Sequence, residues 1–288
     1  KEAPVTSLAG IPTLLGLLVA LPLCAYAAFN GVAGGNPVQI IVALVLAVMA
    51  ASAFVSMRVS NTSTTLMMLP VAASLAGLVV PDHDAASVER LADAAYREFG
   101  AVHVLCNNAG VAAPALLQPT WENCLEDWHW ILGVNLMGVV HGRRSFVPRM
   151  LAGGDEGHIV NTASVAGLLT GSGPYFASKH GVSCLTEGLY KDLKAAGARL
   201  SASVLCPGVI RTQILDAERN RPTQFGGPTD MSALSEREQQ WTTGFRAALE
   251  AGIEPSVVAD AVHDAIVADR YYIVPAQPEF HERIAVRV

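Results

Sequence analysis

The sequence predicts an α/β protein with a parallel sheet, preceded by two or three hydrophobic helices. Three observations support this fold class. Charged residues are almost absent before Pro81 and frequent after it. Long apolar runs fill the first part, whereas short apolar segments alternate with amphipathic helical patterns in the second. We therefore divide the chain into a hydrophobic, membrane-like segment at residues 1–80 and an α/β domain at residues 81–288.

Three apolar runs lie in the first segment, at residues 11–29, 38–57 and 65–80. A helix needs ~20 apolar residues to cross a bilayer, so the first two runs are long enough. The third is short and contains Pro70. A signal peptide explains the first run poorly, because a second long apolar run follows it. We expect membrane association through residues 1–64, and buried helices of a soluble core are the alternative.

The composition excludes several classes of partner. The formal net charge of −6 over 288 residues gives no reason to expect nucleic acid. The five cysteines are scattered without a CxxC pair, which argues against a zinc site or a disulfide framework and indicates a reducing compartment. We therefore expect no metal. The first residue is Lys rather than Met, so we expect a fragment or a processed chain.

The elements of the first half of the α/β domain follow from their patterns. Residues 84–100 predict a helix, with Asp84 as its N-cap and Gly100 as its stop. The stretch "VHVLC" (102–106) predicts a buried strand that leads into a tight turn. Residues 126–150 predict a second helix, and "HIVNTAS" (158–164) a second strand.

The second half continues the alternation. A helix begins at about Tyr175, "SASVLCPG" (201–208) predicts a strand, residues 255–268 predict a helix, and "YYIV" (271–274) a last strand. Such alternation predicts a parallel sheet covered by helices on both faces. Residues 213–250 are rich in polar residues, Gly and Pro, and predict a mobile loop region. Within it, "AERNRP" (217–222) predicts a solvated loop, and Trp121, Trp128 and Trp130 are expected to pack a helix.

Four groups of residues fall just beyond the predicted strands. They are "NNAG" (107–110), Ser164, the Tyr175–Lys179 pair at the start of a helix, and "PGVIRT" (207–212). In a parallel α/β sheet, reactive groups gather at the carboxyl ends of the strands. A lone YxxxK is usually surface helix and a lone NNAG a turn. All four groups in this order indicate one site.

The motifs "NNAG", "VNLMGVVHG", "IVNTASVAG", "PYFASKHGV" and "PGVIRT" make residues 82–288 resemble the short-chain dehydrogenase/reductase family. The resemblance implies a Rossmann-like doubly wound parallel sheet. It also implies an NAD(P)-dependent oxidoreductase that transfers a hydride between nicotinamide and a small alcohol or carbonyl substrate. A homo-oligomer is compatible with this resemblance.

By the same resemblance, Tyr175 is the general acid/base, Ser164 hydrogen-bonds the substrate oxygen, and Lys179 binds the nicotinamide ribose and lowers the pKa of Tyr175. Asn135 would hold a water in the proton relay, or would serve only to tie a strand to a helix. A lysine ammonium one helical turn from a phenol favours the phenolate, which agrees with these roles. The implied cofactor-binding residues are Asn107, Ala109, Gly110, Tyr175, Lys179, Pro207, Gly208, Ile210 and Thr212.

The front half of such a domain is missing from the sequence. A strand, a glycine-rich TGxxxGxG-type loop and a helix should precede Asp82, and no such motif occurs in residues 1–80. The predicted sheet is therefore incomplete, and the strand at 102–106 should become a sheet edge. We expect weakened binding of NAD or NADP, and the residues that discriminate the two cofactors belong to the missing part.

Two readings of function stay open. The first is an active oxidoreductase held at the membrane, with its dehydrogenase-like domain on the cytoplasmic side, where NAD(P)H and reduced cysteines are found. The second is a catalytically defective dehydrogenase remnant fused to a membrane segment, which would be a non-enzymatic membrane protein or an artefactual fragment. The catalytic residues favour the first reading, and the absent glycine loop favours the second.

Overall fold

The computed structural model describes residues 85–113, 119, 121–230, 232, 234–275, 277 and 280. The three apolar runs lie outside these residues, so the predicted N-terminal helices and the domain boundary at Pro81 stay predictions. Among the helices of the described ranges, none combines the length and the apolar character needed to cross a bilayer.

A parallel sheet forms the centre of the described part, as predicted. Its strands are β1 (Val104–Asn107), β2 (Gly157–Thr162), β3 (Leu200–Leu205) and β4 (Tyr272–Ile273), in the order β1-β2-β3-β4. The pairs β1–β2, β2–β3 and β3–β4 are all parallel. Within the described residues, β1 has a strand partner on one side only. The strand at "VHVLC" is thus a sheet edge in this part of the chain.

The helices follow the predicted order, except that α8 lies in a region predicted as a loop. They are α4 (Ala85–Phe99), α5 (Leu125–Leu132), α6 (Gly138–Gly153), α7 (Gly173–Ala195), α8 (Glu236–Glu250) and α9 (Pro255–Val267). The predicted helix at 126–150 comprises α5 and α6, joined without a break by the π-helical turn Gly133–Met137. Short 3₁₀ turns occupy Val165–Gly167, Ile214–Asn220 and Thr223–Phe225.

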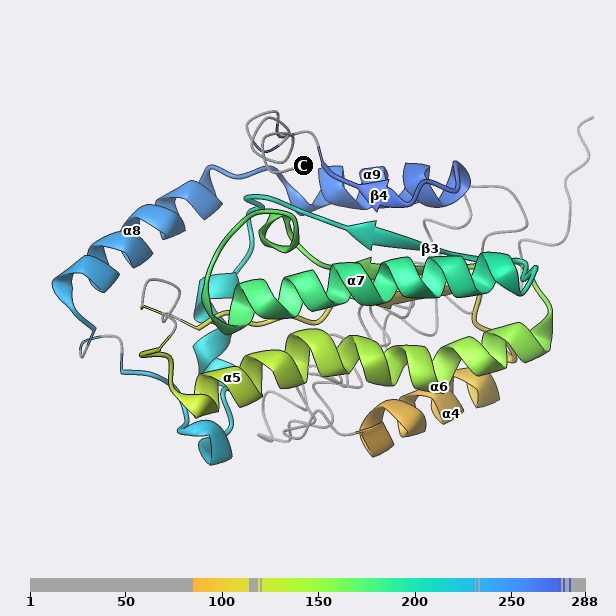
Figure 1. The fold of residues 1–288 in the computed structure, drawn as a ribbon, viewed down its shortest axis with the longest axis horizontal. Coiled ribbons are helices and arrows are strands. Elements are labelled where there is room, and N and C mark those ends of the chain that lie inside the picture. The colour runs from red at the N-terminus through yellow and green to blue at the C-terminus, as the bar shows by residue number, and fades with distance from the viewer. Residues whose placement is uncertain are drawn as a thin grey trace, which may run out of the picture. The chain divides into compact units, whose positions relative to one another are not determined.

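Two apolar clusters show how the helices cover both faces of the sheet. On one face, Val139 of α6 and Val182 of α7 pack with Val204 of β3. On the other, Ala265 of α9 packs with Leu205 of β3, the next residue along the strand. The side chains alternate between faces because a strand has a period of two residues. Figure 1 shows α5 and α6 running beside α7, with α9 across the sheet from them.

The prediction that residues 213–250 form a mobile loop region is wrong in its second half. Residues 236–250 form α8, fifteen residues long. Ser235 begins it with a capping box, in which the serine side chain accepts from the Glu238 N–H and the Glu238 carboxylate accepts from the Ser235 N–H. These reciprocal bonds satisfy two backbone donors and stabilise the first turn. Because α8 buries few residues, its sequence is largely polar. It therefore lacks the apolar periodicity on which the helix predictions rest.

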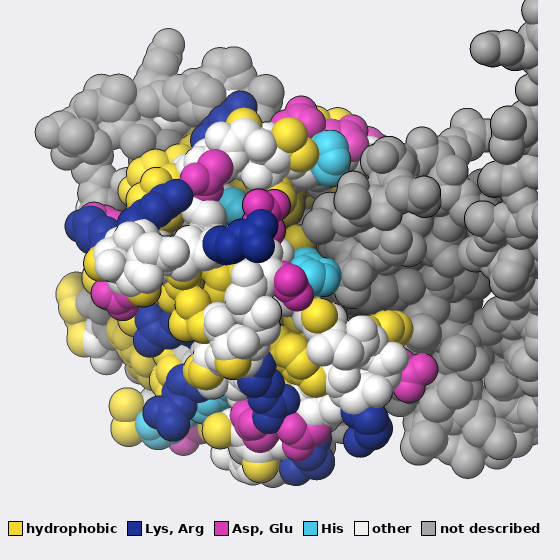
Figure 2. Space-filling model, turned by 90° about the vertical axis from the view of Figure 1, so that its right-hand side faces the viewer, with side chains coloured by type: hydrophobic (Ala, Val, Ile, Leu, Met, Phe, Trp, Pro, Cys, Tyr) yellow, Lys and Arg dark blue, Asp and Glu magenta, His cyan; other side chains and the backbone are white. Residues whose placement is uncertain are grey.

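The surface carries mixed charge. On the face shown in Figure 2, basic and acidic side chains are interspersed with apolar ones. Arg149 of α6 pairs with Glu89 and Asp93 of α4, and its guanidinium also lies over the Tyr96 ring. Exposed pairs of this kind contribute little stability each, but a cation shared by two carboxylates fixes the orientation of α4 on α6.

Candidate active site

The predicted site residues lie where the parallel strands end. Ser164 and Pro207 each lie two residues beyond the end of a strand, β2 and β3 respectively, and Asn107 is the last residue of β1. Parallel strands bring their carboxyl ends to one edge of the sheet, so these three positions share that edge. The first turn of α7 adds Tyr175. The elements therefore collect residues that are up to one hundred positions apart in the chain.

Ser164 is the central contact of the group. Its backbone is extended, with φ −177°, and its side chain caps the 3₁₀ turn by accepting from the Ala166 N–H at 3.1 Å. The hydroxyl donates to the carbonyl of Pro207 at 3.2 Å, and its proximity to the Tyr175 phenol lowers the pKa of that phenol. Ser164 thus joins the ends of β2 and β3 and lies near the start of α7.

Tyr175 and Lys179 lie one turn apart on α7. The helix begins at Gly173, whose φ of +81° favours glycine, and Pro174 occupies its first turn. Lys179 is only 4% exposed, and its Nζ donates to the carbonyl of Thr162 at 3.0 Å. The same Nζ lies 5.7 Å from the centre of the Tyr175 ring. Tyr175 and Lys179 are therefore neighbours at the start of α7, and Lys179 is hydrogen-bonded to the last residue of β2.

Asn135 lies in the π-helical turn and is fully buried. Its Oδ1 accepts from the Val111 N–H at 2.8 Å, and its Nδ2 donates to the Val111 carbonyl at 3.0 Å and to Ser178 Oγ at 3.1 Å. Both amide hydrogens are used in these bonds. The side chain thus ties the loop after β1 to the helices, as the structural alternative expected. A role of Asn135 in a proton relay stays a prediction.

The implied cofactor-binding residues divide into two sets. A Cβ added to Gly110 would lie 3.4 Å from Lys179 Nζ and 3.6 Å from Asn135 Oδ1, so Gly110 belongs to the catalytic group. Gly208 instead faces Gln277 and Phe280, which an added Cβ would strike. The Gln277 side chain is 6% exposed, and its Oε1 has no hydrogen-bond partner among the described residues. Sequence analysis missed Gln277, because no motif marks it.

The other implied residues are more scattered. Asn107 donates to Asn161 Oδ1 at 2.8 Å and packs against Gly142. It therefore links β1 to β2 and to α6. Ala109 is half-buried and Thr212 is exposed. Ile210 is buried and pairs with Ile253 in an isolated parallel bridge. Within the described part of the chain, neither Thr212 nor Ile210 hydrogen-bonds Tyr175.

The pKa of Tyr175 moves in the direction opposite to the prediction. Burial raises the pKa of the phenol above its ordinary value, and the proximity of Ser164 lowers it by less. The expected lowering by the neighbouring ammonium is therefore not seen, because the cost of a buried phenolate exceeds the benefit of a cation 5.7 Å from the ring.

Lys179 is perturbed more strongly. Burial lowers the pKa of Lys179 to about 8, because the ammonium has left water. In its place, among the described residues, it has one neutral acceptor, the Thr162 carbonyl. The side chain therefore changes charge within reach of physiological pH. An ammonium has three N–H donors. Within the described residues, one of them is used in the hydrogen bond to the Thr162 carbonyl. Two donors are thus available to a ligand.

This shift gives a stability prediction for Lys179→Met. Between about pH 8 and pH 10.5 the unfolded lysine binds a proton that the folded one has lost, so the folded wild type gains stability as pH rises through that window. The variant has no such titration. We expect the stability of the wild type relative to the variant to rise by about 2 kcal/mol between pH 7 and pH 10.

Urea unfolding followed by tryptophan fluorescence at both pH values measures this difference. Lys191→Met is the matched control, because Lys191 lies on the same helix with its side chain 71% exposed. A wild-type-minus-variant difference that stays constant from pH 7 to pH 10 contradicts the prediction.

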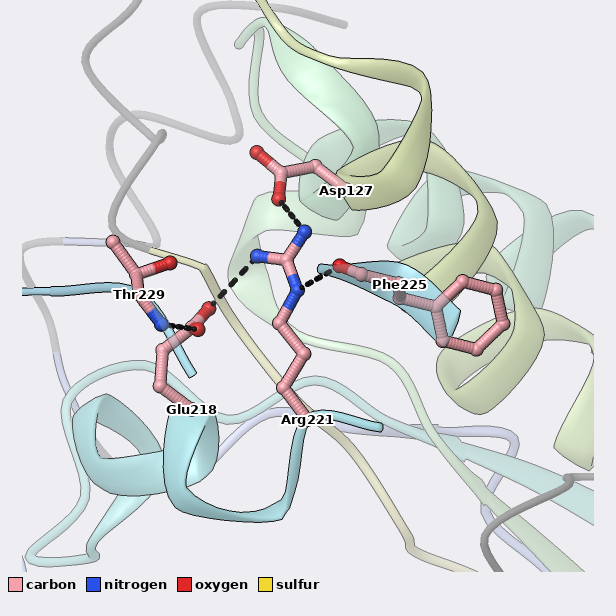
Figure 3. A network of polar contacts seen from close by, with 5 residues as sticks. All are labelled: Asp127, Glu218, Arg221, Phe225 and Thr229. Atoms are coloured by element: carbon pink, nitrogen blue, oxygen red, sulfur yellow. Dashed lines mark hydrogen bonds and ion pairs between the residues drawn. The ribbon is translucent and has the colours of Figure 1, made fainter. Parts of the chain in front are cut away.

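The prediction of a solvated loop at residues 217–222 is also wrong. Ala217, Glu218 and Arg221 are buried, and Arg221 forms ion pairs with Glu218 and with Asp127 of α5 (Figure 3). The Arg221 guanidinium lies 5.2 Å from the ring centre of Trp130. Trp130 packs a helix, as expected, while Trp121 is 83% exposed. The burial of charged residues here depends on a partner about ninety positions away, which the local sequence does not reveal.

Comparisons with known proteins agree with the motifs. A family model described as short chain dehydrogenase matches residues 42–223. A "CLA biosynthesis dehydrogenase/reductase" of Lactiplantibacillus plantarum is 34% identical over 205 residues, which make up 70% of this chain and 70% of the relative. A "C alpha-dehydrogenase" of a Sphingobium species is 34% identical over 209 residues, 72% of this chain and 65% of the relative.

The fold has solved counterparts. A short chain dehydrogenase/reductase from Burkholderia phymatum, determined in complex with NAD, aligns with a TM-score of 0.65 and 42% sequence identity. The alignment covers 71% of this chain and 72% of that one. The chain spans 65–70% of the length of these two curated relatives. The family-model match begins at residue 42, ahead of the boundary predicted at Pro81.

Proposed function

Because the chain belongs to the short-chain dehydrogenase/reductase family, we propose that it is an NAD(P)-dependent oxidoreductase acting on an alcohol or carbonyl group, with Tyr175 as the general acid/base. One observation carries the proposal: Ser164 lies near enough to Tyr175 at the carboxyl edge of the sheet to lower the pKa of its phenol, with Lys179 buried one turn away. A serine, a phenol and a lysine in this arrangement suit proton exchange with a substrate oxygen.

The residues of the site fit a nicotinamide cofactor. Lys179 has two donors available for ribose hydroxyls, and Gly110 leaves the space beside its Nζ open. Gln277 Oε1, a buried acceptor without a partner in the described residues, lies beside Gly208 and suits a carboxamide N–H. The nicotinamide would supply or accept the hydride. The relative solved with NAD supports this choice of cofactor class, and NAD and NADP are both compatible with it.

Each residue has a defined task in this mechanism. In carbonyl reduction, the Tyr175 phenol donates its proton to the substrate oxygen, and the Ser164 hydroxyl hydrogen-bonds the same oxygen. The raised pKa keeps Tyr175 protonated at neutral pH, which suits it as an acid. Lys179 holds the ribose and stabilises the phenolate that forms. Asn135 fixes the loop after β1, and we propose that it also supports a water-mediated return of the proton.

Turnover of NADH and NADPH with a panel of ketones and aldehydes, by the wild type and by Tyr175→Phe, tests this function. The second candidate, a defective remnant without activity, is favoured by the absent glycine-rich loop in residues 1–80 and by the partial coverage of the relatives. Reproducible Tyr175-dependent turnover rejects that candidate.

We also propose that residues 1–64 hold the protein in a membrane, with the dehydrogenase domain on the cytoplasmic side. The full chain should then stay with membranes through alkaline carbonate extraction, because two near-charge-free runs are long enough to span. Arginine near the centre of a span costs about 2.5–3.5 kcal/mol per residue, so a variant with two arginines in each run should be released. Its substitutions are Leu18→Arg, Val19→Arg, Leu44→Arg and Val45→Arg. A wild-type chain found in the soluble fraction contradicts the proposal.

A further inference from the structure

A buried ionic cluster lies beside the candidate site. The Arg221 side chain is 6% exposed and contacts two carboxylates that are equally buried. Its Nη2 lies 2.6 Å from Asp127 Oδ1, and its Nη1 lies 3.4 Å from Glu218 Oε1. Burial alone would lower the pKa of Arg221, but the charges of Asp127 and Glu218 outweigh it and raise that pKa. Arg221 is therefore held as a buried cation between two acidic side chains.

The bonds of the cluster close one segment of the chain on itself (Figure 3). Arg221 Nε donates to the Phe225 carbonyl at 2.7 Å, and Glu218 Oε2 accepts from the Thr229 N–H at 2.9 Å. These partners all lie within residues 218–229. Asp127 alone among the five belongs to another element, α5. The Arg221–Asp127 pair is thus the ionic link between this segment and the helix that leads to Asn135.

The same segment shares an apolar cluster with Tyr175. Ala217 belongs to a buried cluster with Trp130, Ile131 and Val134 from α5 and the π-helical turn. Tyr175 and Phe225 pack against that cluster. Segment 214–227 and Tyr175 therefore pack on the same apolar surface of α5 and the π-helical turn. A buried ion pair adds little stability compared with apolar packing, so its contribution here is the geometry that it imposes.

We propose that Asp127 and Arg221 are positioning residues that hold segment 214–227 on α5, so that Ala217 and Phe225 form an apolar wall beside Tyr175. This wall selects substrates that carry an uncharged apolar group next to the reacting carbon. The inference rests on the proposed oxidoreductase function. No described charge is left unpaired in the cluster, so it offers a substrate carboxylate no partner.

Asp127→Asn is the decisive variant. It removes the charge that links the segment to α5 and leaves the Arg221–Glu218 pair intact, so no unpaired cation is buried. Asp216→Asn is the matched control, because Asp216 lies in the same segment and pairs with Arg246 of α8 at the surface. Arg221→Lys is a second variant, which keeps the charge but loses the forked geometry, in case Asp127→Asn does not fold.

Two measurements decide the proposal. The first is kcat/KM for acetophenone and for pyruvate with a nicotinamide cofactor. We expect the wild type to prefer acetophenone, and Asp127→Asn to lower that preference by about tenfold or more, chiefly through KM for acetophenone. The kcat/KM for the cofactor, measured with pyruvate, should stay within about twofold of wild type. The second is hydrogen–deuterium exchange, which should become faster in residues 214–227 of Asp127→Asn and not of Asp216→Asn.

Each outcome has a clear meaning. An unchanged preference and unchanged exchange in Asp127→Asn, or equal changes in both variants, overturn the positioning role. A wild type that prefers pyruvate overturns the apolar wall. A wild type without any turnover defeats the proposed oxidoreductase function, and the exchange measurement then decides the link between segment and α5 by itself.

Discussion

Tyr175→Phe should lower turnover by about 10²- to 10⁴-fold, which is the usual contribution of a positioned acid/base. The substitution removes the phenolic hydroxyl, which lies near Ser164, and leaves the ring against its apolar neighbours. Ser164 keeps its bonds to Pro207 and Ala166, so no cavity opens and the loss of stability should be about 1 kcal/mol. Activity and stability are therefore expected to separate.

The comparison that decides this is steady-state turnover and thermal unfolding of three chains. Tyr190→Phe is the control, because it makes the same chemical change on α7, about four turns beyond Tyr175. It should retain wild-type turnover. A Tyr175→Phe variant that keeps most of its rate shows that another group moves the proton, and the assignment of Tyr175 then fails.

The pKa of Tyr175 adds a directional test to this prediction. Because burial raises that pKa, the phenol stays protonated through the neutral range. Carbonyl reduction uses the protonated form and should be insensitive to pH there. Alcohol oxidation uses the phenolate and should accelerate as pH rises. Both pH profiles of the wild type, measured with the same substrate pair, check this, and an oxidation rate that falls with increasing pH contradicts it.

Much of the site could be predicted because its parts obey local rules. The period of the apolar residues located β2, β3 and α7, and parallel strands must bring their carboxyl ends together. The convergence of Ser164, Tyr175 and Lys179 follows from those two facts. The pKa of Tyr175 could not be predicted in the same way, because it depends on how deeply the ring is buried and not on the spacing of YxxxK.

Long-range partners account for the remaining differences. "AERNRP" carries the charges of a solvated loop, yet Asp127 neutralises Arg221 from α5 and makes its burial possible. Helix α8 differs from its prediction for another reason, which is that it buries few residues. It buries so little that its sequence lacks an apolar stripe, although the capping box of Ser235 and Glu238 was a readable start signal. These two cap residues predict the start of α8 even though apolar periodicity does not.

We expect this protein to bind NADH and NADPH weakly. The chemical groups at Ser164, Tyr175 and Lys179 are present, but the TGxxxGxG-type motif expected to bind the pyrophosphate does not occur in the sequence of residues 1–80. Each lost charge-assisted hydrogen bond to a phosphate costs about 1.5–3 kcal/mol. Losing two or three such bonds corresponds to a weakening of about two to six orders of magnitude in Kd.

Fluorescence titration of the full chain with NADH and with NADPH measures this affinity. The reference is a chimera in which a complete strand, glycine loop and helix from a relative replace the residues before Asp82. We expect saturable binding in the micromolar range for the chimera and little or none for the natural chain. The buried Lys179 and the unpartnered Gln277 Oε1 supply contacts on the nicotinamide side only, so they cannot replace the pyrophosphate site. Micromolar binding by the natural chain would mean that residues 1–80, part of which the family model matches from residue 42 onward, build a phosphate site of a different sequence.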